Sequence, residues 1–391
     1  MMTVVFEKEV LISALIPALG AVSTRNTVPA IEGILMDCRN EGKCILSAYD
    51  MDKGMRTVIN AEIEEYGACI IHAQKLLQIV RVMPGDRVRI VVDDSLKAVI
   101  ESGRSSFELK ALAASDFPLM PELGGEYGFR VPQHLFRDFV SRVSFAISQN
   151  DQRPAFCGAF FRVLPNKLTV VSCDTNRLAI CEEAILLENT NRDASDLDLE
   201  FIVPGKTLNE VLRLVKDTED DMEIRLTRKH VIFRVGEIVF FSKQIEAEYV
   251  DYTRILPKGY PIELYLSAAD LRGALERCSL ITEDRLAGSI RSFVKLTLED
   301  QVLKVTTVSA AGSVLDEIPV ESVNGGSLVI GFNCKFLLEA LKSCDDGEVL
   351  IRMSTPLMGI SIEKSERRET EPGKDDNSKF LFFVMPLKMN N

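Results

Sequence analysis

The chain contains 391 residues, enough for two or three domains at roughly 100 to 200 residues each. Apolar residues make up 46% and charged residues 27%, a mixture that supports buried cores and excludes wholesale disorder. Lysine and arginine number 46 against 58 aspartates and glutamates, which gives a net charge of −12. This charge excludes a strongly basic nucleic-acid-binding protein as a description of the whole chain and leaves room for a local basic surface.

The sequence also predicts the compartment. Residues 1–10 include Glu7, Lys8 and Glu9 and lack a basic stretch followed by an apolar one, so we expect no secretion signal there. No segment approaches the ~20 consecutive apolar residues that a membrane-spanning helix needs. The nine cysteines lie in apolar segments without C-x-x-C spacing, which is typical of buried thiols in a reducing compartment. We therefore expect a cytoplasmic protein.

One pattern occurs three times, at a period of about one third of the chain. In each copy, an apolar strand end leads through a short cap into apolar positions spaced three and four apart, which predicts an amphipathic helix. These segments are residues 71–81, 203–213 and 332–342. A short strand followed by another helical pattern precedes each of them, at residues 4–22, 129–149 and 264–282.

Strand patterns complete each repeat. Hairpins with suitable turns lie between the two helices, at residues 33–48, 159–172 and 292–308. Three strands close each repeat, at residues 87–92, 98–101 and 106–112, at 222–226, 231–235 and 238–245, and at 348–353, 359–362 and 379–386.

These elements predict an α+β protein of three tandem repeats, each with two helices packed on antiparallel sheets. We place the domains at residues 1–122, 123–255 and 256–391. Two stretches interrupt the repeat. Residues 187–198 are expected to form a polar surface loop, and residues 365–378 a charged insertion within the last hairpin.

Two patterns suggest chemistry at first sight. Pro204-Gly205-Lys206-Thr207 resembles the end of a phosphate-binding loop, but Glu200 stands where that loop requires glycine. The acidic pairs at 93–94, 220–221 and 345–346 lie in turns, where solvated carboxylates are more common than metal ligands.

The histidines add no catalytic pattern. No nucleophile motif accompanies His72, His134 or His230. We therefore expect no catalytic site, no metal site and no cofactor, and we favour a binding protein over an enzyme. The alternative from another class is a metal-dependent nucleic-acid enzyme that uses the acidic pairs.

Basic residues recur on the predicted helices, and ordinary solvated helix faces would explain each of them individually. Three of them, Arg81, Arg213 and Lys342, occupy the last, corresponding place of the repeated helical segments. Cations that repeat with the scaffold suit a ligand that also repeats, such as the phosphates of duplex DNA. The complete set is Arg81, Arg137, Arg142, Arg213, Arg272, Arg277 and Lys342.

Short motifs along essentially the whole chain indicate a family. They are Ser115-Asp116-Phe117-Pro118, Cys173-Asp174-Thr175-Asn176-Arg177-Leu178-Ala179, Tyr252-Thr253-Arg254-Ile255-Leu256-Pro257, Ile330-Gly331-Phe332-Asn333 and Phe383-Val384-Met385-Pro386-Leu387. With these motifs the chain resembles the bacterial sliding-clamp family, the beta subunits of the DNA polymerase III holoenzyme. The resemblance implies a head-to-tail homodimer in which six like domains close a ring, with helices lining the hole and sheets outside.

The resemblance also implies the activity. The expected protein is a processivity factor without a catalytic site, which encircles duplex DNA without sequence specificity and tethers the replicative polymerase. Because a ring is retained by topology, weak phosphate contacts suffice and an acidic chain is compatible with DNA. Arg25, Gln149, Asn150 and Arg153 are expected DNA contacts by resemblance. The implied partners are double-stranded DNA, a second copy, the polymerase alpha subunit, the clamp loader, and other polymerases and repair proteins with clamp-binding peptides, with no membrane.

Two further sites follow from the resemblance. The dimer interface would join the strand of Phe107 and Leu109 to the third repeat near Leu280 and Ile281, although these four could equally be core residues. A hydrophobic cleft between the second and third repeats would receive partner peptides. Its wall would comprise Phe156, Cys173, Thr175, Asn176, Arg177, Leu178, Val250, Arg254, Ile255, Asn333, Phe336, Leu357, Gly359, Phe383, Val384, Met385, Pro386, Leu387, Lys388 and Met389.

The residue types of this wall suit varied partners. Flexible methionines and aliphatic side chains can repack around different apolar anchors, while Arg177 and Arg254 would bind carbonyls or carboxylates at the rim. The tail could instead be a plain closing strand. A clamp-like scaffold that has lost ring closure is a third hypothesis for the whole protein.

Overall fold

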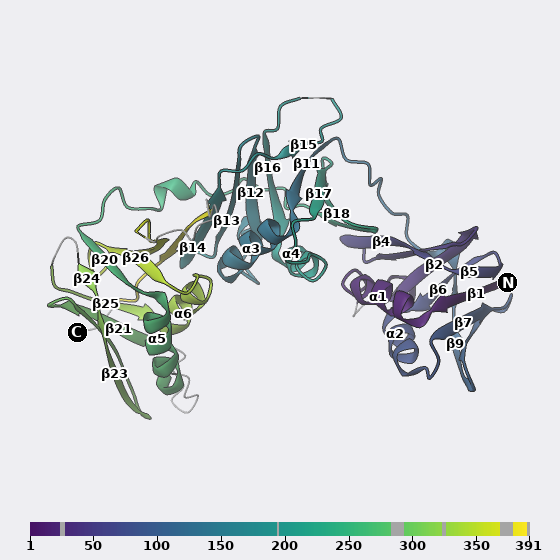
Figure 1. The fold of residues 1–391 in the computed structure, drawn as a ribbon, viewed down its shortest axis with the longest axis horizontal. Coiled ribbons are helices and arrows are strands. Elements are labelled where there is room, and N and C mark those ends of the chain that lie inside the picture. Colours follow the sequence, from purple (N-terminus) through teal and green to yellow (C-terminus); the bar gives the residue numbers. More distant parts are fainter. Residues whose placement is uncertain (24–27, 194, 283–292, 323–325, 368–377, 389–391) are drawn as a thin grey trace. The chain divides into compact units, whose positions relative to one another are not determined.

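The computed structural model describes residues 1–23, 28–193, 195–282, 293–322, 326–367 and 378–388. The chain, drawn as a ribbon in Figure 1, divides into two compact units by its internal contacts. Unit 1 comprises residues 1–137, 188–197 and 206–244, and unit 2 comprises residues 138–187, 198–205 and 245–391. None of the helices in the described ranges is long and apolar enough to cross a membrane.

The first repeat lies entirely in unit 1. Its elements are β1 (Met2–Glu7), α1 (Lys8–Leu19), β2 (Gly33–Asn40), β3 (Lys43–Tyr49), β4 (Lys53–Asn60), β5 (Glu62–Glu65), β6 (Ala68–His72), α2 (Ala73–Val82), β7 (Arg87–Val92), β8 (Lys97–Ser102), β9 (Ser105–Lys110) and β10 (Leu112–Ala113).

The second repeat is divided between the two units. It contains β11 (Tyr127–Pro132), α3 (Gln133–Val143), β12 (Gly158–Leu164), β13 (Lys167–Cys173), β14 (Arg177–Glu183), β15 (Glu188–Asn189), β16 (Leu199–Pro204), α4 (Gly205–Val211), β17 (Asp221–Leu226), β18 (His230–Val235) and β19 (Ile238–Lys243).

The third repeat lies in unit 2. It contains β20 (Ile262–Ser267), α5 (Ala268–Thr282), β21 (Phe293–Glu299), β22 (Val302–Ser309), β23 (Gly312–Pro319), β24 (Glu321–Ser322), β25 (Leu328–Asn333), α6 (Cys334–Lys342), β26 (Glu348–Met353), β27 (Ile360–Lys364) and β28 (Ser378–Val384).

The sheet orders confirm three tandem α+β repeats. A five-stranded sheet has the order β5-β1-β7-β8-β9, and the same order recurs as β15-β11-β17-β18-β19 and as β24-β20-β26-β27-β28. The second sheets of the repeats are β10-β6-β2-β3-β4, β16-β12-β13-β14 and β25-β21-β22-β23. The strands within these sheets pair antiparallel, as the hairpin patterns predict.

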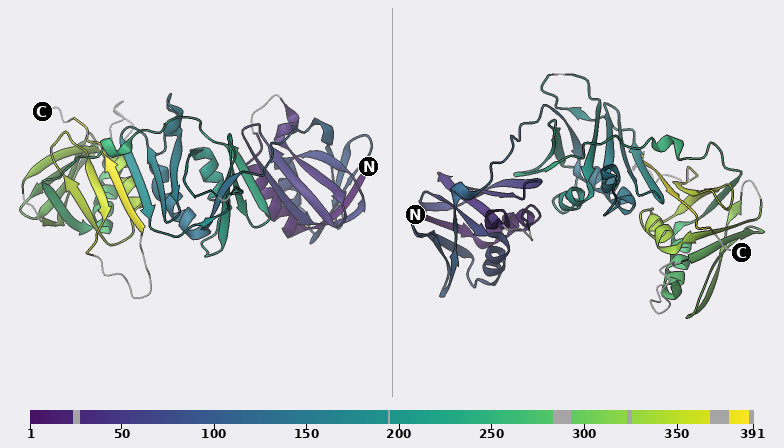
Figure 2. Two further views of the ribbon diagram at one scale, coloured as in Figure 1. Left: turned by 90° about the horizontal axis from the view of Figure 1, so that it is seen from above. Right: turned by 180° about the vertical axis from the view of Figure 1, so that it is seen from behind.

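Two sheets continue from one repeat into the next. In unit 1, β4 pairs with β19, and Gly54 stands opposite Phe241; we term this ladder the N-terminal seam. In unit 2, β14 pairs with β28, and Leu178 stands opposite Phe383; this is the C-terminal seam. The yellow strand β28 lies beside β14 in Figure 2. These ladders explain why each compact unit contains part of the second repeat.

The helices form for the reasons that their sequences indicate. In α2, Leu76, Leu77 and Val80 are buried, and the His72 side chain caps the helix by accepting a hydrogen bond from the Lys75 amide. In α6 the side chain of Asn333 plays the same capping part. Figure 1 shows α1 beside α2 and α5 beside α6, which pack against each other. The predicted helix at residues 203–213 is shorter in the structure, where α4 ends at Val211.

We predict that Gly54→Ala destabilises the N-terminal seam. A β-carbon at Gly54 would lie 2.4 Å from Cζ of Phe241 and 2.9 Å from the Ala48 carbonyl oxygen, so the buried phenylalanine ring would have to move. Overpacking of this kind costs about 1–3 kcal/mol. Thermal unfolding followed by circular dichroism should register a lower midpoint.

The matched control is Gly259→Ala, because a β-carbon at Gly259 meets no atom within 4 Å. This variant should keep the wild-type midpoint. Equal midpoints for the two variants would contradict the packing constraint at the seam.

Candidate functional site

The residues predicted to contact DNA lie on the helices or in adjoining turns. Arg25 lies outside the described residues. Arg142 and Arg272 are partly buried, whereas the others are exposed. The exposed set is Arg81 in α2, Arg137 in α3, Gln149, Asn150 and Arg153 between α3 and β12, Arg213 after α4, Arg277 in α5 and Lys342 at the end of α6.

Acidic partners neutralise several of these cations. Exposed pairs of this kind are worth at most about 1 kcal/mol each, so a phosphate can replace the carboxylate at little cost. Apart from Arg272, whose side chain is 26% exposed, the basic members of these pairs are exposed. The pairs are Arg153–Asp151 at 2.9 Å, Arg213–Glu210 at 2.8 Å, Arg272–Asp346 at 2.6 Å, Arg277–Asp316 at 2.8 Å and Lys342–Glu276 at 3.8 Å.

Arg142 differs from the other predicted DNA contacts because its guanidinium forms ion pairs with two carboxylates of the protein and is largely shielded from solvent. Its side chain is 11% exposed, with Nε 2.6 Å from Asp138 and Nη2 2.7 Å from Asp345. Burial by itself lowers the pKa of Arg142, but the two carboxylates outweigh that effect and the pKa is raised. These contacts tie α3 to the turn after α6.

Four of the predicted cleft residues meet in one apolar cluster in unit 2. Phe156, Cys173, Leu178 and Phe383 are buried together with Val171. Burial raises the pKa of the Cys173 thiol, so this side chain stays neutral and packs as an apolar group. We term this set the C-terminal junction cluster.

The linker between the second and third repeats packs on this cluster. Val250 and Ile255, both predicted, are partly buried against it, as are Tyr249 and Tyr252. The tyrosines were not predicted, although aromatic residues in a linker are a usable signal for packing. Arg254 points away from the cluster: its side chain is 86% exposed and pairs with Asp251.

Arg177 forms a buried bridge between the repeats. Its guanidinium donates to Asp174 at 2.7 Å and to Glu339 of α6, and its side chain is 8% exposed. The same group stacks 4.4 Å from the ring centroid of Phe336, another predicted cleft residue. The two carboxylate partners were not predicted. Arg177 thus holds β14 against α6 in addition to any role at a rim.

The chain end passes from one repeat to the other beside the cluster. The amide of Met385 donates to the Asn176 carbonyl at 2.8 Å, and the amide of Leu387 donates to the Gly331 carbonyl at 2.8 Å. Val384 is buried, and Pro386 is partly buried between these bonds. The tail is therefore held by backbone pairing, while Lys388 is exposed and Met389 lies outside the described residues.

The remaining predicted cleft residues lie around this core. Thr175 is exposed with a φ of 75°, and Asn333 caps α6. Gly359 is buried where a β-carbon would lie 2.4 Å from Cζ of Phe383. Exposed apolar side chains remain beside these residues, namely Leu357 at 68%, Met358 at 38% and Met385 at 38%.

The residues predicted for the dimer interface lie next to free sheet edges. In the described chain, β9 ends the five-stranded sheet and β23 ends the four-stranded sheet. Phe107 in β9 is 40% exposed, and Leu280 in α5 is 77% exposed. Leu109 and Ile281 are partly buried. Leu315 in β23, which was not predicted, is 62% exposed.

Other possible sites have structural contacts of their own. The carboxylate of Asp93 accepts hydrogen bonds within its turn, and Asp345 and Asp346 pair with arginines. Within the described residues there is no cluster of three or more histidine, cysteine or acidic side chains suited to a metal ion. A cavity of about 610 Å³ in unit 1 is bordered by Lys8 and Arg87 but contains no predicted site residue.

Comparison with known proteins gives consistent matches along the chain. Three family models match in order: the DNA polymerase III beta subunit N-terminal domain at residues 2–121, central domain at 130–251 and C-terminal domain at 253–372. The beta sliding clamp of Staphylococcus epidermidis is 29% identical over 358 residues, which cover 89% of this chain and 92% of that protein.

Solved structures agree. The Pseudomonas aeruginosa DNA polymerase III subunit beta sliding clamp, crystallised with griselimycin, is 27% identical and covers 99% of this chain and 100% of its own, with a TM-score of 0.86. The Bacillus subtilis DNA polymerase sliding clamp is 23% identical, covers 100% of both chains and has a TM-score of 0.88, which indicates a shared fold.

We predict that Arg177→Ala lowers the free energy of unfolding by about 3–5 kcal/mol, since removing one member of a buried ion pair leaves its carboxylates uncompensated. Arg254→Ala is the control, because its exposed pair contributes at most about 1 kcal/mol. Urea unfolding measures both. If the two variants unfold at the same urea concentration, the bridging role of Arg177 is wrong.

Proposed function

Because the chain belongs to the DNA polymerase III beta subunit family, we propose that it acts as a DNA sliding clamp. It encircles duplex DNA without sequence specificity and holds the replicative polymerase on its template. The family consists of processivity factors, so the protein supplies a tether and performs no catalysis of its own. The observation that carries this proposal is the ordered match of all three family domains.

Ring closure is supported by the rule that the two seams follow. In each seam, the strand after the hairpin of one repeat pairs with the last strand of the next repeat, as β4 with β19 and β14 with β28. The corresponding strands left at sheet edges are β23 and β9. We propose that β23 of one copy pairs with β9 of a second copy, which gives a head-to-tail homodimer closed by two identical contacts.

Exposed apolar residues beside these edges support the same contact. Phe107, Leu280 and Leu315 would be covered when the two copies join. The pairing would also remove two strand edges that otherwise invite aggregation. Leu109 and Ile281 complete the predicted interface.

Weak DNA contact is consistent with the ion pairs on the helices. A ring held by topology gains nothing from tight phosphate binding, which would slow its movement. We propose that the exposed cations Arg81, Arg137, Arg213, Arg277 and Lys342 meet the phosphates, together with Gln149, Asn150 and Arg153. Arg25 and Arg272 belong to the same proposal, whereas Arg142 would have to leave Asp138 and Asp345 to take part.

The C-terminal junction cluster is the proposed docking surface for partner peptides. Its apolar core, the flexible Met385 and the exposed Leu357 suit apolar anchors of different shapes. Because Met385 and Leu387 are held by two backbone hydrogen bonds, a peptide can add contacts to the tail without ordering it first. The proposed partners are the polymerase alpha subunit, the clamp loader, and other polymerases and repair proteins in the cytoplasm.

The domain limits at residues 122/123 and 255/256 belong to this proposal as well. They fall within linkers that follow the last strand of one repeat. Cofactors have no part in the proposed function.

The decisive experiment is retention on nicked circular DNA. After incubation with a clamp loader and ATP, the protein should co-elute with the circle in gel filtration, and a single restriction cut should release it. Release only after linearisation is the signature of a closed ring that slides off ends.

Phe107→Asp provides the matched variant, because a charge at the β9 edge should prevent ring closure and abolish retention. Glu108→Asp in the same strand should keep it. Equal retention of the wild type before and after the cut would mean ordinary surface binding and would refute the ring.

We further predict that griselimycin, which is bound to the Pseudomonas aeruginosa clamp in its crystal structure, binds this chain at the C-terminal junction cluster. Leu357→Ala, or truncation after Val384, should weaken binding about tenfold or more, since burying a leucine side chain contributes about 1.5–3 kcal/mol. Isothermal titration calorimetry measures the affinity. Leu186→Ala is the control. It alters a different exposed leucine, which is 85% exposed, and should bind griselimycin with wild-type affinity.

A further inference from the structure

Two turns in different repeats share one backbone design. They join β3 to β4 and β13 to β14. Each begins with an aspartate, Asp50 or Asp174, whose carboxylate accepts the amides two and three residues ahead, at 3.0 and 2.8 Å in the first turn and at 3.0 and 2.9 Å in the second. The next residue has a positive φ in both, 80° at Met51 and 75° at Thr175. The two positions are therefore structurally equivalent.

Each turn leads into a seam with a buried phenylalanine at the same place. Phe383 belongs to the C-terminal junction cluster, and Phe241 belongs to a buried cluster with Tyr49 and Ile232. The ring centroids of Tyr49 and Phe241 are 5.6 Å apart. We term this second set the N-terminal junction cluster. It is the counterpart, in unit 1, of the proposed peptide-docking surface.

A linker of the same pattern covers each cluster. In unit 2, Tyr252 and Ile255 lie against the C-terminal junction cluster. In unit 1, Phe117, Met120 and Leu123 lie against the N-terminal junction cluster. In both linkers an aspartate precedes an aromatic residue, and an aliphatic or thioether side chain follows three residues later.

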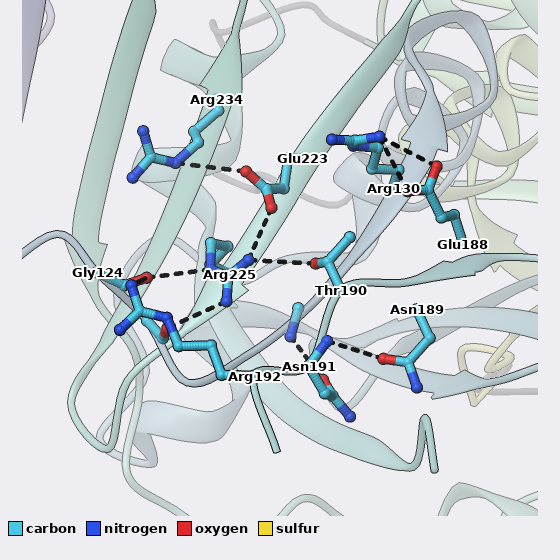
Figure 3. A network of polar contacts seen from close by, with 12 residues as sticks. Gly124, Arg130, Glu188, Asn189, Thr190, Asn191, Arg192, Glu223, Arg225 and Arg234 are labelled. Atoms are coloured by element: carbon cyan, nitrogen blue, oxygen red, sulfur yellow. Dashed lines mark hydrogen bonds and ion pairs between the residues drawn. The ribbon is translucent and has the colours of Figure 1, made fainter. Parts of the chain in front are cut away.

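The two linkers are fastened differently: arginine side chains bind the backbone of the unit 1 linker, whereas the Tyr249 hydroxyl of the unit 2 linker donates to the Val171 carbonyl at 3.3 Å. Arg234 donates to the Leu123 carbonyl at 2.9 Å, and Arg225 donates to the carbonyls of Gly124 and Gly125 at 3.1 and 3.2 Å. Arg225 is 8% exposed and is itself fixed by Glu223. Figure 3 shows Arg225 reaching Gly124 of the linker, with Arg225 and Arg234 both joined to Glu223. The unit 2 linker instead carries the exposed Arg254, paired within its own linker.

We propose that the N-terminal junction cluster is a duplicate of the peptide-docking surface, occupied by the chain's own linker at residues 117–123. This inference rests on the peptide role proposed for the C-terminal junction cluster. A linker attached at both ends has an effective concentration on the order of millimolar, so a free peptide competes poorly with it. The arginine clasp raises that barrier further. Each chain consequently offers one docking surface to partners instead of two.

The test adds the linker sequence as a free peptide to a variant whose own linker no longer covers the cluster. The double variant Phe117→Ala/Met120→Ala removes the two side chains that cover the cluster, and a fluorescent peptide with the sequence of residues 114–124 restores them in trans. The full-length variant should bind one more equivalent of peptide than the wild type, by anisotropy titration. Leu119→Ala, in the same linker but 95% exposed, should bind like the wild type.

Leu357→Ala distinguishes the two surfaces, because it should weaken any binding seen in the wild type about tenfold and leave the affinity of the additional equivalent unchanged. A double variant with a cooperative unfolding transition and no additional equivalent would overturn the inference. If that variant still binds griselimycin, the proposed peptide surface stands and only the duplicate is refuted.

A second variant tests the inference independently if the double variant fails to fold. Arg234→Gln removes the hydrogen bond to Leu123, so the linker amides at residues 117–124 should exchange hydrogen at least tenfold faster. Arg130→Gln is the control, because it breaks the ion pair between Arg130 and Glu188 (Figure 3). This variant should leave the exchange rates of the linker amides unchanged. Unchanged exchange in Arg234→Gln would mean that the clasp does not hold the linker, and would overturn the proposal.

Discussion

Backbone pairing across the two seams is the interaction on which the rest of the molecule depends. A β-ladder fixes the spacing and direction of its strands, so each seam also fixes the turn, the linker and the helix beside it. The junction clusters and the Arg177 bridge lie next to β4–β19 or β14–β28, and Arg234 of the neighbouring strand β18 binds the unit 1 linker. Among the sheet edges that no seam uses are those of β9 and β23, which would pair with a second copy in the proposed dimer.

Arginine has three different structural uses in this chain. Arg177 and Arg142, whose side chains are 8% and 11% exposed, join segments of different repeats through carboxylates. Arg225 and Arg234 bind backbone carbonyls and fix a linker. Arg213 and Arg277 are exposed and pair with the carboxylates of Glu210 and Asp316. Burial decides between these uses, because the cost of breaking an ion pair rises as water is excluded.

Local patterns were sufficient to predict much of the fold. The helices α2 and α6 have apolar residues on one face and a capping residue before them, so their positions could be read from the sequence. The bounds of β7 and β26 coincide with those predicted, since both are short apolar strands between polar turns. The seam strands β4 and β14 and the edge strand β23 were not predicted. In β4, Gly54, Met55 and Thr57 are buried without strict alternation, because part of its cover comes from another repeat.

The positions of the site residues could be predicted from the sequence, but the residues that they contact could not. Family motifs located Arg177, yet its partner Glu339 is 162 residues away, and the Asp345 partner of Arg142 is 203 residues away. No local pattern identifies a partner at such a separation. The pairing of Phe117 and Met120 with the N-terminal junction cluster was missed for the same reason, although the motif that contains Phe117 had been noted.

In the proposed ring, the two linkers would make the seams within each chain stronger than the contacts between the copies. Each seam within a chain is backed by a covalent connection, residues 111–126 or 244–261, so its strands meet again after any local separation. In a ring of two copies, the contacts between β9 and β23 would have no such connection. Mechanical strain on the ring would therefore part it at a boundary between subunits while the seams stayed closed. In the proposed ring, a DNA duplex would enter and leave at that boundary.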